Sequence, residues 1–216
     1  MHWNENLYRL HEKLGGAFFG TPPAGLAEDV RPNGTLILPY RGAKVTVCPE
    51  YDAVVRTNIS GGAPRGGAMW TMAAAEVELN RRRTVTVQPQ KGLRGLLGKK
   101  TEAQSIEGYQ VKTDDEAFAR LMLSRPALQG CLRKAREKAP AVLPLFLKLI
   151  PSDGGTDHLL EVRTNLFPVE WGTLKGVGDG DEILPAKVVE DASTDLLERL
   201  VETAKAAYGA ACDTSV

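Results

Sequence analysis

Cysteine is scarce in this chain, and its cysteines follow no ligand or disulfide pattern. The three are far apart, and none belongs to a C-x-x-C pair: Cys48, Cys131 and Cys212. An odd, scattered set predicts neither a disulfide framework nor a zinc site, and free cysteine packs as a small hydrophobic residue. The three histidines show no H-x-x-x-H spacing. We therefore expect neither a metal nor a cofactor.

Long apolar runs and an excess of one charge are also missing. No apolar run approaches the roughly 20 residues that span a bilayer, and residues 1–5 lack the basic-then-apolar start of a secretory signal. Lys and Arg number 27, and so do Asp and Glu. A neutral chain with a pI of about 6.8 and 6% aromatic residues lacks the footprint of a nucleic-acid binder. These absences predict a cytoplasmic protein that does not bind nucleic acid.

Familiar catalytic motifs are absent as well. The segment Ser60–Gly67 has four glycines and Arg65, a composition that suits phosphate binding, but it lacks the G-K-[ST] ending of a P-loop. It also lies between two expected strands rather than between a strand and a helix, which favours a hairpin loop. No G-x-G-x-x-G or G-x-S-x-G motif occurs. The sequence thus identifies no catalytic residue.

What the sequence does contain is an alternation of helical and strand patterns. Trp3, Leu7, Leu10 and Leu14 recur at helical spacing before a Gly-Gly stop. Consecutive β-branched runs separated by short Gly- or Pro-marked turns favour an antiparallel sheet. We predict an α+β fold with helices over 3–14, 113–125, 126–138 and 194–208, and strands over 36–40, 43–48, 51–59, 70–79, 84–87, 106–112, 143–150 and 158–164.

The ends of these elements carry finer expectations. Thr113 and Glu116 form a capping box, so Thr113 is expected to begin the helix that carries Phe118, Leu121 and Met122 on one apolar stripe. Pro144 makes the next strand an edge strand or marks its start. Ser193 or Thr194 is expected to cap the last helix. The elements fit a single domain over residues 1–216, with two subdomains, 1–104 and 105–216, as the alternative.

Several segments resemble a group of uncharacterised bacterial proteins, over roughly residues 7–135. The resemblance is carried by Pro39-Tyr-Arg-Gly-Ala-Lys-Val-Thr-Val47, by Gly92-Leu-Arg-Gly-Leu-Leu-Gly98 and by the strand-then-helix pattern of residues 109–126. One departure is Gly108, which stands where that group commonly has Asp or Glu. The resemblance implies one compact bacterial domain and implies no catalytic or binding residue.

The charges are segregated along the chain although their sum is zero. Residues 81–100 contain seven basic side chains and no acidic one, whereas residues 179–198 contain seven acidic side chains and one lysine. This layout has three interpretations: the two blocks pair with one another, each block is simply solvated, or the blocks steer a charged partner. Because surface ion pairs stabilise a fold by only about 0–1 kcal/mol each, stability gives little reason for such a layout.

These observations predict a non-enzymatic interaction or ligand-binding module. The expected partner is an acidic protein or an anionic ligand, and the residues expected to contact it are basic: Arg65, Arg81, Arg82, Arg83, Arg94, Lys99 and Lys100. The alternative is an enzyme of unrecognised class whose cleft includes Asp52, Arg56, Arg65 and His158. A weaker possibility is peripheral membrane contact through Leu93–Lys100, where three leucines accompany three cations.

Overall fold

The sheet is the frame on which the rest of the molecule is built. The computed structural model describes residues 3–20, 34–52, 68–89, 106, 108–138, 145–153, 155–164 and 186–215. In these residues eight strands form one antiparallel sheet in the order β1-β2-β3-β4-β8-β7-β5-β6. Strands from before and after residue 104 are therefore neighbours in the same sheet. The mainly antiparallel α+β prediction is confirmed.

The strands follow the predicted runs closely, with one addition. Their bounds are β1 (Ala17–Phe19), β2 (Thr35–Tyr40), β3 (Ala43–Asp52), β4 (Ala68–Glu78), β5 (Val85–Pro89), β6 (Tyr109–Thr113), β7 (Leu145–Pro151) and β8 (Asp157–Thr164). The short edge strand β1 was not predicted from the sequence. The strand expected to begin at Tyr51 does not start there, because β3 continues through Pro49 as far as Asp52. Residues 53–59 lie outside the described part of the chain.

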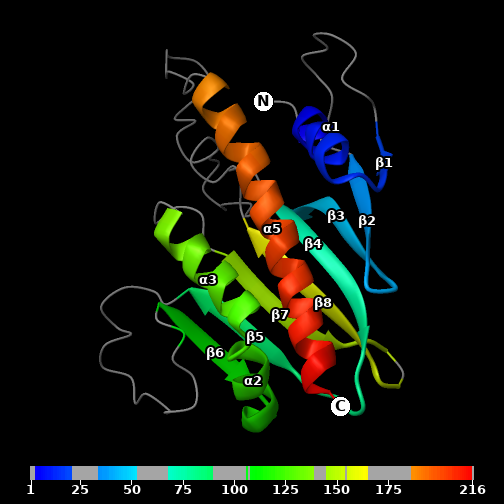
Figure 1. Cartoon of the computed structure of the whole chain (residues 1–216), viewed down its shortest axis with the longest axis vertical. Coiled ribbons are helices and arrows are strands. Elements are labelled where there is room, and N and C mark those ends of the chain that lie inside the picture. The colour runs from blue at the N-terminus through cyan, green and yellow to red at the C-terminus, as the bar shows by residue number, and fades with distance from the viewer. Residues whose placement is uncertain are drawn as a thin grey trace, which may run out of the picture.

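Four helices pack against one face of the sheet (Figure 1). They are α1 (Trp3–Leu14), α2 (Glu116–Leu123), α3 (Pro126–Lys138) and α5 (Ala186–Thr214). The long α5 runs diagonally across the sheet and contacts β3, β4 and β8 as well as the other three helices. Within the described residues, no helix is both long enough and apolar enough to cross a membrane. We call the helix-covered side of the sheet the inner face and the opposite side the outer face.

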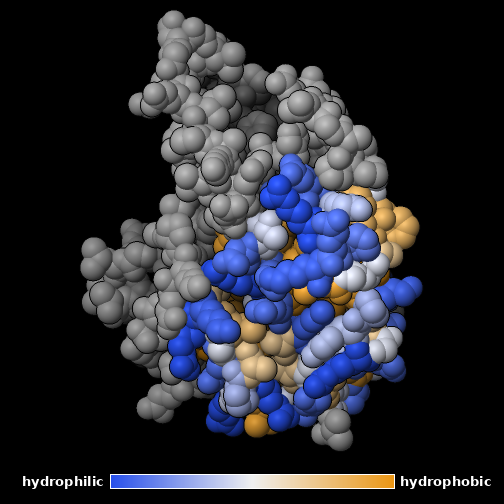
Figure 2. Space-filling model, turned by 45° about the horizontal axis from the view of Figure 1, so that its top comes forward, coloured by the Kyte–Doolittle hydropathy of each residue, from blue (hydrophilic) through white to orange (hydrophobic). Residues whose placement is uncertain are grey.

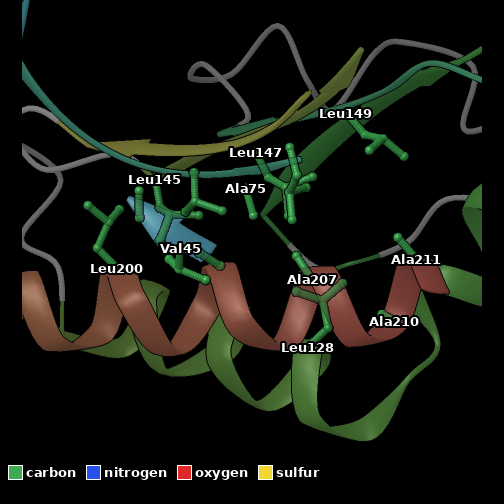
Figure 3. Packing of buried hydrophobic residues seen from close by; sticks show 14 of the residues in the cluster. Val45, Ala75, Leu128, Leu145, Leu147, Leu149, Leu200, Ala207, Ala210 and Ala211 are labelled. Carbon is green, nitrogen blue, oxygen red and sulfur yellow. The ribbon is translucent and has the colours of Figure 1, made fainter. Parts of the chain in front are cut away.

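The hydrophobic core fills the space between the inner face and the helices. Alternate strand residues point inward and are buried, as in β7, where Leu145, Leu147 and Leu149 are at most 6% exposed. Figure 3 shows these leucines lying across from Leu200 and Ala207 of α5. Near the C-terminal end of α5 the buried side chains are small: Ala204, Ala207, Ala210 and Ala211. One continuous hydrophobic cluster includes residues of all four helices and of β2 to β8.

The helical side presents mostly hydrophilic residues to solvent. Figure 2 shows that view: among the described residues, hydrophilic side chains cover most of the visible surface, and hydrophobic ones appear in smaller areas between them. Two large apolar side chains are well exposed in the described residues, Phe19 at 57% and Leu121 at 56%. Leu121 was expected on the buried stripe of α2, and this prediction is wrong. The buried stripe includes Ala119 and Leu123 besides Phe118 and Met122, which turns Leu121 outward.

Two helix starts also differ from expectation. The N-cap of α2 is Asp115, whose side chain accepts a hydrogen bond from Phe118 N at 3.0 Å. Thr113 Oγ1 accepts from Asp115 N instead of capping the helix. The last helix begins at Ala186, so Thr194 lies within it and donates a hydrogen bond from Oγ1 to Asn6 of α1 at 3.2 Å.

Pro144 precedes the start of β7, which lies between β8 and β5 and is not an edge strand.

Gly130 offers a test of how α3 is stabilised. It lies inside the helix, and a Cβ added there meets nothing within 4 Å. Gly130→Ala should therefore raise the free energy of unfolding by about 0.5–1 kcal/mol, measured by urea denaturation, because alanine loses less backbone entropy on folding. The matched variant Gly209→Ala in α5 should gain less, since its Cβ would lie 3.1 Å from Arg41 Nη1. A loss of stability in Gly130→Ala would contradict this account.

Candidate functional site

Several residues of the predicted binding set and of the alternative catalytic cleft lie outside the described part of the chain. They are Arg56, Arg65, Arg94, Lys99 and Lys100, together with the loop Ser60–Gly67 and the segment Leu93–Lys100. Only Arg81, Arg82 and Arg83 of the predicted anion-binding set are described. The candidate site is therefore built from these three residues and from the surfaces that the sheet forms.

The three consecutive arginines have different environments. Arg81 and Arg82 are exposed, whereas only 6% of Arg83 is accessible to solvent. The Arg83 guanidinium lies over the Phe118 ring, 4.3 Å from its centroid, and donates from Nε to Asp115 Oδ2 at 3.1 Å. Arg83 thus belongs to the interior, while Arg81 and Arg82 remain on the surface.

Asp115 connects the arginines to the start of α2. Its Oδ1 accepts from Phe118 N, and its Oδ2 accepts from both Arg83 and Arg81, the latter at 2.8 Å. The bond from Phe118 N, followed by the positive charges of the two arginines, lowers the pKa of Asp115 below its ordinary value. The carboxylate therefore offsets one of the two positive charges beside it, which weakens the attraction of this pair of arginines for an external anion.

His158 is used structurally in the same region. The ring is fully buried, and its Nε2 accepts from the backbone N of Arg83 at 3.0 Å. Nδ1 must then carry the proton, which it donates to the carbonyl oxygen of Thr156 at 2.7 Å. Both ring nitrogens are thus engaged with backbone, which leaves neither free for proton transfer. We name Arg83, Asp115 and His158 the polar node.

The structure describes two residues of the predicted catalytic cleft, Asp52 and His158, and it places them far apart. Asp52 pairs with Ala68 on β4, and His158 pairs with Val77 on the same strand. At about 3.3 Å per residue, these two positions on β4 are about 30 Å apart. Asp52 and His158 therefore lie toward opposite ends of the sheet and do not share a cleft.

The described ion pairs of the acidic block are made with residues outside the basic segment. Glu198 of α5 bonds to Lys13 of α1 at 2.6 Å, and Asp195 bonds to Arg199 one turn along its own helix. The first pair links α1 to α5 at the surface, and the second lies within one turn of α5. The remaining acidic residues of the block lie outside the described residues or, as with Glu190 and Asp191, in the part of α5 whose side chains are not described.

The outer face carries the less expected chemistry. An antiparallel sheet that covers a core on one side commonly shows polar residues on the other. Here half-buried apolar residues stand among the polar ones on the outer face: Ile37, Met72, Phe146, Ile150 and Leu159. The helices already complete the core on the inner face, so these side chains form a second apolar surface.

A charged cluster lies at the centre of this surface. Arg163 of β8 bonds to Glu161 at 2.5 Å on the same strand and to Glu50 of β3 at 3.1 Å. Glu161 is only 8% exposed, and Lys148 of β7 stands directly opposite it in the register. Among the described residues, Arg163 Nε is a buried atom with no hydrogen-bond partner. The cluster contains two positive and two negative charges.

Cys48 lies on the outer face beside this cluster. Burial, with the negative charges of Glu50 and Glu161, raises the pKa of its thiol above the ordinary value. The thiol is therefore held protonated at neutral pH, and a protonated thiol is a poor nucleophile and metal ligand. In the described residues, no three side chains of His, Cys, Asp or Glu come together as a metal site.

The outer face was not predicted from the sequence, although β8 carries part of its pattern. Leu159, Glu161 and Arg163 alternate with buried residues along β8, which places them on one side of the strand. The pairing of β8 with β4 and β7 is what brings Glu50 and Lys148 to them. That pairing depends on long-range sheet order, which the local pattern does not contain.

Comparisons with known proteins supply no family for the chain. No family model matches it, and no curated protein matches it. Among solved structures, it is similar to the crystal structure of the mycobacterial trehalose monomycolate transport factor A, TtfA, at 13% sequence identity and a TM-score of 0.39. The alignment covers 92% of this chain and 96% of that one. A likeness of this degree carries no argument about function.

Proposed function

We propose that the chain is a non-enzymatic interaction module that binds another polypeptide through the outer face of its sheet. The observation that carries the proposal is the second apolar surface, which stands on the side of the sheet opposite the helices. Apolar side chains beyond the needs of the core are typical of binding surfaces. The mixture of Met72 and Phe146 with the Glu50–Arg163–Glu161 cluster is of this kind.

The chemistry of the described residues supports binding rather than catalysis. The buried histidine is engaged with backbone through both nitrogens. The Asp115 carboxylate is engaged by two arginines and a helix terminus. The thiol on the outer face is held protonated. In the polar node, His158 and Asp115 are thus occupied in holding the fold, and on the outer face the Cys48 thiol is unreactive at neutral pH.

Affinity measurements with outer-face variants test the proposal. Proteins cross-linked to the immobilised full chain would be identified, purified and titrated against it. The double variant Met72→Lys/Phe146→Lys should weaken binding at least about tenfold, because it places two charges in the apolar part of the interface. Leu121→Lys, which changes an exposed leucine on the helical side, is the matched control and should leave the affinity unchanged.

The half-buried Cys48 supplies an independent measurement on the wild-type protein. Its alkylation rate, followed by mass spectrometry, should fall when a purified partner is added, while those of Cys131 and Cys212 should not. If Leu121→Lys abolishes binding and the double variant retains it, the binding surface lies on the helical side and the proposal is wrong.

A further inference from the structure

The β7–β8 hairpin carries two complementary columns of side chains on the outer face. Along β8 the column reads Leu159, Glu161, Arg163, and along β7 it reads Ile150, Lys148, Phe146. The register places these residues directly opposite one another in pairs: apolar with apolar, acid with base, and guanidinium with aromatic ring. Each column is thus the chemical complement of the other.

From this complementarity we infer that the occupant of the outer face is a second copy of the same chain. The inference rests on the proposed function and names its partner. In the proposed dimer the outer faces of two copies pack against each other. The two-fold axis lies between the two sheets, parallel to the strands and midway between β7 and β8. It brings β8 of each copy over β7 of the other. Every contact in a two-fold interface occurs twice, because each copy uses the same patch. Glu161 then faces the second copy's Lys148, and Arg163 faces its Phe146.

The chemistry of this arrangement is favourable at each level of the hairpin. Leu159 meets Ile150 of the other copy and loses its remaining contact with water. An arginine over an aromatic ring within about 6 Å is an attractive contact. Two sheets packed face to face stand about 10 Å apart. Only the small residues Ala74 and Thr86 flank the central Glu161–Lys148 row, so the longer side chains have room between the sheets.

The charges also exclude the other simple two-fold arrangement. An axis running across the strands at the central row would place Glu161 opposite Glu161 and Lys148 opposite Lys148. Like charges juxtaposed in an interface are strongly disfavoured. The parallel axis instead pairs every charge of this row with its opposite, and the Glu50–Arg163 pair stays within each chain.

Mixing two charge-reversed variants tests the inference. The wild-type full chain should form dimers between micromolar and millimolar concentration in sedimentation experiments. Glu161→Lys alone and Lys148→Glu alone should each weaken self-association more than about tenfold, because like charges then face each other. An equimolar mixture should associate again, since each copy then carries the charge that the other lacks. Glu12→Lys, an exposed change on α1, is the control and should dimerise like the wild type.

A second pair of variants guards against misfolding of Glu161→Lys. Ile150→Glu mixed with Leu159→Lys should also associate more tightly than either variant alone. A wild-type protein that stays monomeric, or folded variants that do not recover association on mixing, would overturn the inference. In that case the double variant Met72→Lys/Phe146→Lys still tests the proposed function, because its affinity for a purified partner is measured in a separate experiment.

Discussion

Asp115→Ala should lower the free energy of unfolding by about 3–5 kcal/mol, because it leaves the buried Arg83 guanidinium without a counter-charge. It also removes the N-cap of α2, a loss typically of about 1 kcal/mol that forms part of the same total. Urea denaturation followed by circular dichroism measures the change. The control is Arg81→Ala, which removes the exposed partner of the same carboxylate and should change stability by less than about 1 kcal/mol.

The charge on Asp115 predicts a pH dependence with a definite sign. Since its pKa is lowered in the folded protein, its contribution to stability is full above the ordinary aspartate pKa of about 3.9. It is lost as the pH falls through the lower, folded value. Asp115→Asn keeps a capping oxygen but not the charge, so the stability difference from wild type should be largest near neutrality and shrink in acid. A difference that grows on acidification would contradict the assignment.

Gly16→Ala should lower the free energy of unfolding by about 3 kcal/mol or more. Gly16 has a φ of +88°, which costs a residue with a side chain about 1–2 kcal/mol. A Cβ there would also lie 2.4 Å from the carbonyl oxygen of Ile37, a backbone atom of β2 that cannot move alone. Thermal unfolding of the variant measures the loss.

The neighbouring glycine separates these two causes. Gly15 also has a positive φ, +75°, but an added Cβ meets nothing within 4 Å. Gly15→Ala should therefore cost only the conformational part, about 1–2 kcal/mol. Equal losses in the two variants would mean that the contact with β2 contributes nothing, and the packing argument would fail.

Local patterns were sufficient to predict most helices and strands. Trp3, Leu7 and Leu10 indicated α1 by their spacing alone, and all three are buried. Pro126 marked the start of α3 because the residue before a proline avoids the helical conformation. Such signals are local, and the physics that fixes them acts over a few residues.

The candidate surface could not be predicted because it depends on distant pairing. Nothing near Glu161 in the sequence indicates that Glu50 and Lys148 stand beside it in the sheet. The run Arg81-Arg82-Arg83 predicts one exposed basic patch. Arg83 is nevertheless buried, because it packs on Phe118 and pairs with Asp115. Asp115 rather than Thr113 caps α2, and that carboxylate is also the arginines' partner.

The order of the strands constrains how the chain is assembled during synthesis. β4 and β5 are consecutive in sequence, but β8 and β7 lie between them in the sheet. Strands β1 to β4 are joined to β5 and β6 only through β8 and β7. This connection cannot form until residues as far as 164 have left the ribosome. Pairings between such distant segments close long loops and form slowly. The nascent chain therefore exposes unpaired strand edges for most of its translation, and a fragment ending after α3 lacks the hairpin that joins its two groups of strands.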